Sequence, residues 1–188
     1  VMQRLGSDFY PIVCKLPLHW TPPKSAPGEF IDLFGVTWRR QSYGEGYYME
    51  LHKSPLATAR IEDLDDYPWP DPLDPGFTDG LAEDAETIYE RTDYALMADS
   101  GFKSIWEVGW FLRGYRQLLC DLISNPQFVA ALFSKLLEIN MAATGRFLDE
   151  VGRYVQVVRT GDDLASQEDA IMSPITFRTF LTPLYKKY

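Results

Sequence analysis

Two adjacent carboxylates, Asp162 and Asp163, follow a run of β-prone residues at positions 154–160. The valines of this run suit a pleated, packed surface, so the sequence predicts a buried strand. Adjacent aspartates at its end are costly to desolvate unless water, a cation or a ligand donor meets them. Ligands bind at the carboxyl ends of strands in β/α units, so we expect both aspartates at a functional site. The structural alternative is a turn made of turn-forming residues.

Three further polar residues follow strand ends in the same way. A second β-prone run, 94–98, ends at Asp99, which has the same functional reading and the same turn-forming alternative. Gln167 could enter the pocket of Asp162 and Asp163 as a neutral donor and acceptor, or be an exposed loop amide. Glu107 could serve as an acid, a base or a metal ligand. It could instead form a capping box with Ser104 at a helix start, and we slightly favour the cap.

The histidines and cysteines do not form a metal-binding pattern. His19 and His52 are the only histidines, and they have no ligand spacing with each other or with Cys14 or Cys120. We therefore expect no metal site made wholly within this chain. Cys120 lies in an apolar helical pattern and is expected to pack as a small hydrophobe. Neither a disulfide nor a redox role is predicted.

Composition limits the class of protein. The chain has 188 residues, of which 46% are hydrophobic and 14% aromatic, enough for one sizeable core, and we expect a single domain over residues 1–188. Its 18 Lys and Arg against 27 Asp and Glu give a net charge of -9, which repels nucleic acid and anionic membranes. No apolar run approaches the ~20 residues that span a bilayer. The start lacks a secretory signal, and we expect a cytoplasmic protein.

The elements that would position these residues alternate along the chain. In the first part of the chain, the sequence predicts a strand at 8–13 and a proline-interrupted loop at 17–27. It then predicts a β-hairpin, in which 36–40 and 47–51 are joined by a longer turn, and a helical turn at 61–66. The second part predicts a helix at 81–90, the strand at 94–98, a helix at 104–122, a helix at 125–152 and a helix from Ser173 and Pro174. This order is typical of an α/β protein with parallel strands.

A closed barrel is favoured over an open nucleotide-binding sheet. The chain lacks both a Gly-x-Gly-x-x-Gly turn after a strand and a phosphate-binding Gly-Lys-Ser/Thr loop. A complete (β/α)8 or TIM barrel needs about 250 residues, and about four candidate core strands predict roughly half of one. The chain opens on Val1 and closes at Tyr188 in a helical pattern, so we expect an excerpt of a longer polypeptide.

Several segments together resemble the uroporphyrinogen decarboxylase (URO-D) superfamily. They follow one another over nearly the whole chain, and their order and spacing carry the likeness: Asp32, Leu33, Phe34, Gly35 and Val36; Pro55, Leu56 and Ala57 with Leu64 and 67–72; 110–114; and Gly161, Asp162, Asp163, Leu164, Gln167, Ser173, Pro174, Phe177, Phe180, Pro183, Tyr185 and Lys186. The resemblance implies a TIM barrel. The superfamily contains cofactor-free decarboxylases of uroporphyrinogen and zinc-dependent methyltransferases, including O-demethylase components, that act with corrinoid proteins.

The resemblance is closer to the methyltransferase branch. The decarboxylases carry an N-terminal Gln-Ala-Gly-Arg segment and a later Phe-Asp-Ser-Trp-type sequence, whereas this chain lacks the first and reads Thr160, Gly161, Asp162, Asp163 at the second. The zinc ligands of the methyltransferase branch are a His-x-Cys pair and a later Cys, which would lie beyond Tyr188. The resemblance thus implies zinc and a corrinoid carried by a partner protein if the chain is a methyltransferase, and no cofactor if it is a decarboxylase.

The expected function is methyl transfer between a methylated or methoxylated small molecule and a corrinoid protein. Asp162, Asp163 and Glu107 are the catalytic candidates, and Asp99, Gln167 and Arg113 are the substrate-binding candidates. Rim carboxylates would accept hydrogen bonds from the substrate or orient a metal-bound one.

Arginines could pair with the carboxylates of a tetrapyrrole or corrinoid, although surface arginines are commoner. The four considered are Arg39, Arg40, Arg113 and Arg116. Two alternative functions stay open. One is decarboxylation of uroporphyrinogen to coproporphyrinogen, in which Asp162 or Asp99 would stabilise a protonated pyrrole by charge. The other is a non-catalytic half-barrel that binds a corrinoid protein or pairs with a second chain as a homodimer.

Overall fold

A computed structural model describes residues 6–102 and 104–188 of the chain. The chain forms two compact units. Unit 1 contains residues 6–19, Asp71–Ser104 and Ile139–Asp162, and unit 2 contains Trp20–Pro70, Ile105–Glu138 and Asp163–Tyr188. Each unit is assembled from separate segments of the chain. The composition of a continuous stretch of sequence therefore cannot identify either unit. The single domain expected from the sequence stays a prediction.

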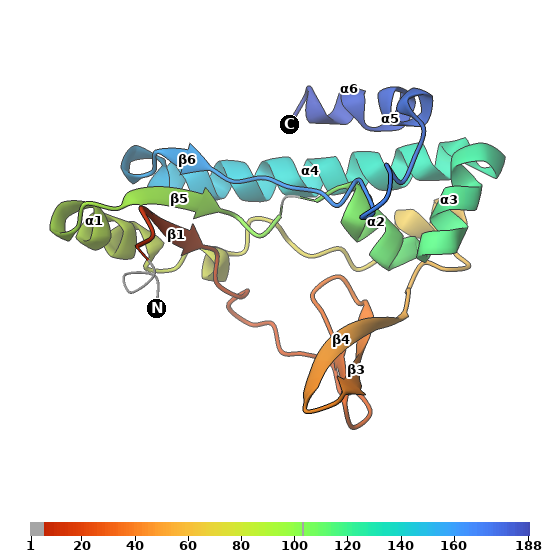
Figure 1. Ribbon diagram of the computed structural model, residues 1–188, viewed down its shortest axis with the longest axis horizontal. Coiled ribbons are helices and arrows are strands. Elements are labelled where there is room, and N and C mark those ends of the chain that lie inside the picture. The colour runs from red at the N-terminus through yellow and green to blue at the C-terminus, as the bar shows by residue number, and fades with distance from the viewer. Residues whose placement is uncertain (1–5, 103) are drawn as a thin grey trace. The chain divides into compact units, whose positions relative to one another are not determined.

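Unit 1 is built on a parallel sheet of three strands in the order β1-β5-β6. These strands are β1 (Phe9–Val13), β5 (Ala95–Asp99) and β6 (Val157–Val158). β1 and β5 pair from Phe9 with Ala95 to Val13 with Asp99, and their arrows point the same way in Figure 1. The two strands confirm the predicted runs at 8–13 and 94–98. Their carboxyl ends share one edge of the sheet, where ligands bind in α/β proteins.

The core of unit 1 joins this sheet to helices. Leu96 and Ala98 of β5 are buried, as is Ala85 of α1 (Leu81–Arg91). The second part of α4 (Pro126–Val151) contributes Phe147 and Val151, which are also buried. Two single turns, η3 (Pro75–Phe77) and η4 (Gly152–Tyr154), complete the unit. The predicted helix at 81–90 is confirmed to within one residue at its end.

The predicted buried strand at 154–160 is wrong in both length and burial. β6 contains only Val157 and Val158, whose side chains are 37% and 51% exposed. The helical turn η4 takes up the chain as far as Tyr154, and β6 is an edge strand that pairs only with β5 among the described residues. Valine propensity identified an extended path here, but it could not identify burial, which depends on neighbouring elements.

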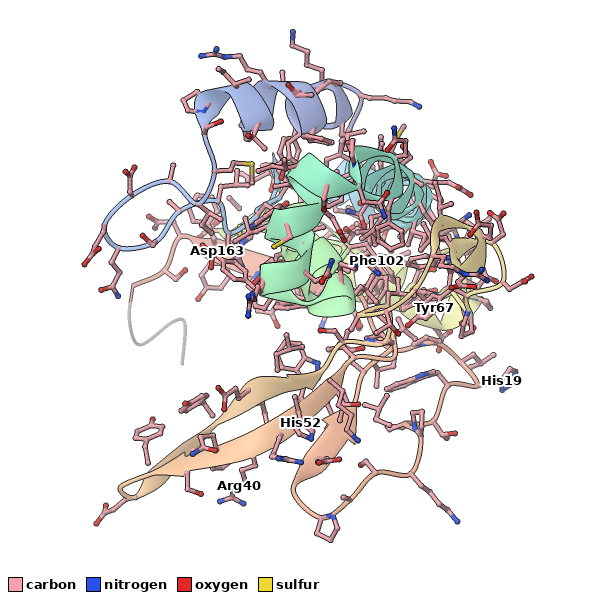
Figure 2. All side chains as sticks on the ribbon, turned by 90° about the vertical axis from the view of Figure 1, so that its right-hand side faces the viewer. His19, Arg40, His52, Tyr67, Phe102 and Asp163 are labelled. Carbon is pink, nitrogen blue, oxygen red and sulfur yellow. The ribbon has the colours of Figure 1, made fainter. Side chains whose placement is uncertain are left out.

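Unit 2 contains an antiparallel sheet in the order β2-β3-β4. The long hairpin of β3 (Thr37–Tyr43) and β4 (Gly46–Lys53) confirms the predicted one, and β2 (Glu29–Ile31) was not predicted. The turn is shorter than expected, because Tyr43 pairs with Gly46 and only two residues lie between them. Gly44 has a φ of 48°, a backbone conformation that glycine adopts readily. We call this three-stranded sheet of β2, β3 and β4 the ribbon. Figure 2 shows Arg40 and His52 on it.

The helical part of unit 2 consists of α2 (Trp106–Arg113), α3 (Tyr115–Ser124), the first part of α4, α5 (Pro174–Phe180) and α6 (Thr182–Tyr185), with the turn η2 (Ile61–Leu64). The single helix predicted at 104–122 is broken at Gly114, whose φ of 88° lies outside the helical range. The starts of α4 and α5 are confirmed, and Ser173 caps α5 by accepting a hydrogen bond from the Thr176 N–H.

Large apolar side chains form the core of unit 2. Trp106 and Phe133 are buried with ring centroids 6.3 Å apart, and Leu112, Leu118 and Leu132 are completely buried around them. Cys120 is exposed, so its predicted packing inside the core is wrong.

The fold is therefore α/β with a parallel sheet, as predicted at that level. The described residues show three parallel strands and no closed barrel. One helical segment, Pro126–Tyr154, is long and apolar enough to cross a membrane by length and composition, with half of the relevant window buried inside the protein. A core helix meets the same criterion, so this is weak evidence for a membrane span.

Candidate functional site

The carboxyl end of β5 carries a fixed carboxylate, Asp99. Its Oδ1 accepts the Gly101 N–H at 3.1 Å, an Asx-type contact that shapes the loop after the strand. Its Oδ2 accepts a hydrogen bond from Arg159 Nη1 at 3.4 Å. The Asp99 side chain is 9% exposed and that of Arg159 is 57% exposed. A nearly buried carboxylate at a strand end is thus joined to an accessible guanidinium.

Asp162 lies beyond the carboxyl end of the neighbouring strand, and a hydroxyl group fixes its position. Ser104 Oγ donates to Asp162 Oδ1 at 2.7 Å. The Ser104 carbonyl in turn accepts a hydrogen bond from Asn140 Nδ2 at 3.2 Å. Ser104 and Asn140 are both buried, whereas Asp162 is half-buried. This chain of contacts connects α4, the loop after β5 and the loop after β6 within unit 1.

A second contact ties the same loop to α4. Ser100 Oγ lies 2.9 Å from Thr144 Oγ1, and Thr144 follows Asn140 by one helical turn. Asn140 and Thr144 interrupt an otherwise apolar face of α4, and they hold the loop that follows β5. From the sequence, Asn140 was placed only within the helix predicted at 125–152. The signal that could have identified it is a polar pair at i and i+4 within that helix.

The predicted capping box is wrong. Helix α2 begins at Trp106, and Ile105 occupies the N-cap position without a side-chain cap. Ser104 precedes the cap position, and its hydroxyl donates to Asp162 instead. Glu107 lies in the first turn of α2, in unit 2, where its side chain is half-buried. The catalytic role proposed for Glu107 stays a prediction.

Asp163 and Gln167 belong to unit 2 and are exposed on the loop that leads to α5. Figure 2 labels Asp163 on this loop. The groups that unit 1 itself brings to one end of its sheet are therefore Asp99, Arg159 and Asp162. Of these, Arg159 was not predicted. The roles of Asp163 and Gln167 stay predictions.

The structure shows Arg113 in a set of structural contacts, and its role in substrate binding stays a prediction. Its side chain is 6% exposed, and Nε donates to Asp121 Oδ2 at 2.6 Å. Nη1 donates to the carbonyls of Leu56 and Ala59, at 2.6 Å and 2.7 Å. The guanidinium also lies 4.0 Å from the ring centroid of Phe128. A guanidinium used in this way cannot reach a ligand carboxylate without breaking the core of unit 2.

The charged residues of the ribbon contact one another. Arg39 Nη2 donates to Glu29 Oε1 at 2.7 Å, and His52 Nε2 lies 3.4 Å from the same oxygen. The hydrogen bond from Arg39 is the main reason that the pKa of Glu29 lies below its ordinary 4.5, and burial partly opposes this shift. The Arg40 guanidinium lies 3.9 Å from the ring centroid of Tyr47. These contacts stabilise the ribbon.

The zinc ligands that the family resemblance implies are a His-x-Cys pair and a later Cys, and none of them was expected among the residues of this chain. Zinc sites need three or four N, S or O ligands in close proximity. Within residues 6–102 and 104–188 there is no group of three or more His, Cys, Asp and Glu side chains that could hold a metal ion.

Comparison with known proteins gives one structural likeness. No family model matches the chain, and no curated protein matches it. A solved structure of a methyltransferase from Methanosarcina mazei resembles it with a TM-score of 0.51 and 16% sequence identity. The likeness covers 84% of this chain and 44% of the methyltransferase, so the chain spans less than half the length of that protein. At this identity the likeness shows the fold alone.

Proposed function

We propose that this chain belongs to a methyltransferase of the URO-D superfamily. In this proposal the enzyme transfers a methyl group between a methylated or methoxylated small molecule and a corrinoid carried by a partner protein. The likeness to a methyltransferase fold over 84% of the chain supports the proposal. The ordered motifs from residue 32 to residue 186 support the choice of superfamily.

The observation that carries the proposal is the hydrogen bond between Ser104 and Asp162. Turn and cap residues usually satisfy their side chains locally, within a few residues. Asp162 instead accepts a hydroxyl hydrogen bond from a residue 58 positions earlier in the chain. That contact fixes one carboxylate oxygen beyond the carboxyl end of β6, and α/β proteins commonly bind ligands at this end of their sheets. A fixed acceptor of this kind suits the orientation of a substrate donor group.

The roles proposed for the chain's own residues are limited to binding and orientation. Asp162 accepts a hydrogen bond from a donor group of the substrate. Ser104 holds the Asp162 carboxylate in place. The described residues form no metal site, so none of the roles proposed for them is assigned through zinc.

The test is a pair of turnover assays on the protein translated from the whole natural reading frame. One assay supplies cob(I)alamin or a reduced, unmethylated corrinoid protein as methyl acceptor with a panel of methoxylated and methylated donors, and the other supplies uroporphyrinogen. We expect methyl transfer and no decarboxylation. Coproporphyrinogen formation would replace the proposal with the decarboxylase alternative, and turnover in neither assay would leave the binding module as the better account.

A further inference from the structure

Arg159 stands directly beside Asp99 because of the strand pairing. Its backbone N–H donates to the Ala98 carbonyl at 2.8 Å, which continues the β5–β6 pairing beyond Val158. The two side chains therefore leave adjacent parallel strands at the same edge of the sheet. This is the edge at which α/β proteins bind ligands.

The contact with Asp99 restrains the guanidinium without covering it. Only Nη1 of Arg159 is hydrogen-bonded to a described residue, at 3.4 Å from Asp99 Oδ2. The side chain remains 57% exposed. A guanidinium has five N–H donors in a rigid planar fork that matches the two oxygens of a carboxylate. Most of that fork thus remains accessible to a ligand.

Other arginines of the described chain are used differently. Arg113 is buried against Asp121, Arg39 is paired with Glu29, and Arg146 is paired with Glu150 along α4. Arg40 lies against the ring of Tyr47. Arg159 differs from these four because it combines an accessible guanidinium with a position at the carboxyl end of a parallel strand.

We propose that Arg159 binds the carboxylate of a small anionic substrate, with Asp99 as the residue that positions it. The methylated nature of that substrate rests on the proposed function, but the binding of a carboxylate does not. Asp99 and Asp162 lie at the same end of the sheet and repel an anion at long range, so attraction must come from direct contact with the guanidinium. Binding is therefore expected to weaken as salt is added.

The test compares two probes that share a methoxy group and differ in charge. Methoxyacetate carries a carboxylate, and 2-methoxyethanol does not. Binding of each to the full chain is measured by isothermal titration calorimetry and by NMR chemical-shift changes of the Arg159 side chain. We expect methoxyacetate to bind about tenfold more tightly than 2-methoxyethanol, because the neutral probe cannot form a charge-assisted pair.

Variants of Arg159 and of a control arginine distinguish specific binding of the carboxylate by Arg159 from nonspecific attraction by positive charge. Arg159→Gln is expected to weaken methoxyacetate binding about tenfold, and Arg159→Lys, which keeps the charge but loses the planar fork, should be intermediate. Arg91→Gln is the matched control, since Arg91 is an exposed arginine of unit 1 in the last turn of α1, before β5 begins. It should bind methoxyacetate like the native chain.

Failure of this proposal is distinguishable from failure of the proposed function. Equal binding of the two probes, no binding of methoxyacetate, or unchanged binding in Arg159→Gln would each overturn the carboxylate site, whatever the turnover assays give. Selective binding that is lost in Arg159→Gln supports it even in a protein that transfers no methyl group. The thermal unfolding midpoint of each variant is measured to show that the fold is intact.

Discussion

Arg113 Nε donates to Asp121 Oδ2 at 2.6 Å inside unit 2, and both side chains are less than 10% exposed. Two carbonyl oxygens, of Leu56 and Ala59, accept further hydrogen bonds from the same guanidinium. The pair therefore joins the turn between α2 and α3 to the segment that follows the ribbon. Removing one partner would leave a charge buried without compensation, which is far more costly than losing an exposed pair.

The first prediction concerns this pair. Arg113→Ala is expected to lower the free energy of unfolding by about 3–5 kcal/mol, measured by urea denaturation. Lys135→Ala is the control, because Lys135 forms an ion pair with Glu138 on the surface of α4, and such pairs contribute less than about 1 kcal/mol. Equal losses in the two variants would contradict a structural role for Arg113 and would reopen its assignment to substrate.

A second prediction tests the close approach of α2 and α4 in unit 2. A Cβ at Gly109 would lie 2.7 Å from Cε1 of the buried Phe133 ring. Helix propensity alone favours alanine over glycine by about 1 kcal/mol, whereas overpacking a core costs about 1–3 kcal/mol. Because Phe133 is 1% exposed, a shift of its ring would disturb the packed core, and Gly109→Ala should lower the free energy of unfolding.

The control for Gly109→Ala is Gly145→Ala on α4. Apart from its chain neighbours and the backbone of α4 itself, no atom of the described residues lies within 4 Å of a Cβ at that position, so helix propensity dominates there. Gly145→Ala should raise the free energy of unfolding by about 1 kcal/mol. We expect the two substitutions to change the free energy of unfolding in opposite directions. The changes are measured from the midpoints of denaturant unfolding curves that share the same m-value. A stabilising Gly109→Ala would mean that α2 and α4 are not in contact at this point.

Glu29 supplies a prediction about pH. Its hydrogen bond from Arg39 holds the Glu29 pKa below the ordinary 4.5. The contribution of a carboxyl group with a lowered pKa is fully present above the ordinary value and is lost as the pH falls through the lowered one. The difference in unfolding free energy between the native chain and Glu29→Gln should therefore be constant near neutral pH and shrink under acidic conditions. A difference that grows on acidification would contradict the pairing.

Much of the fold could be predicted from the sequence because its signals are local. The long helix α4 starts at the predicted Asn125 and Pro126, and β1 and β5 lie in the β-prone runs predicted at 8–13 and 94–98. The break at Gly114 was missed because one glycine costs a helix only about 1 kcal/mol and does not disturb the apolar pattern around it. β2, with three residues, is too short to show a period.

The candidate site was predictable only in part. Asp99 and Asp162 follow strands, so a rule about strand ends identifies them, although their function stays a prediction. Asn140 was not identified because its contact with Ser104 joins residues 36 positions apart, and in sequence it is one polar residue in an apolar pattern. The burial of Arg113 was not predicted because nothing local shows that Asp121 lies close enough to hold it in the core.

The network behind Asp162 gives a further prediction. Asn140→Leu removes the hydrogen bond from Asn140 Nδ2 to the buried Ser104 carbonyl, and losing a hydrogen bond of this kind costs about 0.5–1.5 kcal/mol. The amides of residues 100–102 and 104, in the loop after β5, should therefore exchange with deuterium about fivefold faster or more. Met141→Leu, at the neighbouring exposed position, should leave the exchange unchanged. Unchanged exchange in Asn140→Leu would show that α4 does not hold this loop.

The most direct test of the central claim is the methyl-transfer rate of Asp162→Asn in the protein translated from the whole reading frame. Asparagine preserves size and can still accept the Ser104 hydrogen bond, but it lacks the charge. The account predicts a loss of about 100-fold in rate with an unchanged unfolding midpoint, because the substrate is no longer held in a reactive orientation. The matched control is Asp149→Asn, at an exposed position of α4, which should be fully active. A fully active Asp162→Asn would contradict the assignment of this end of the sheet as the site of chemistry.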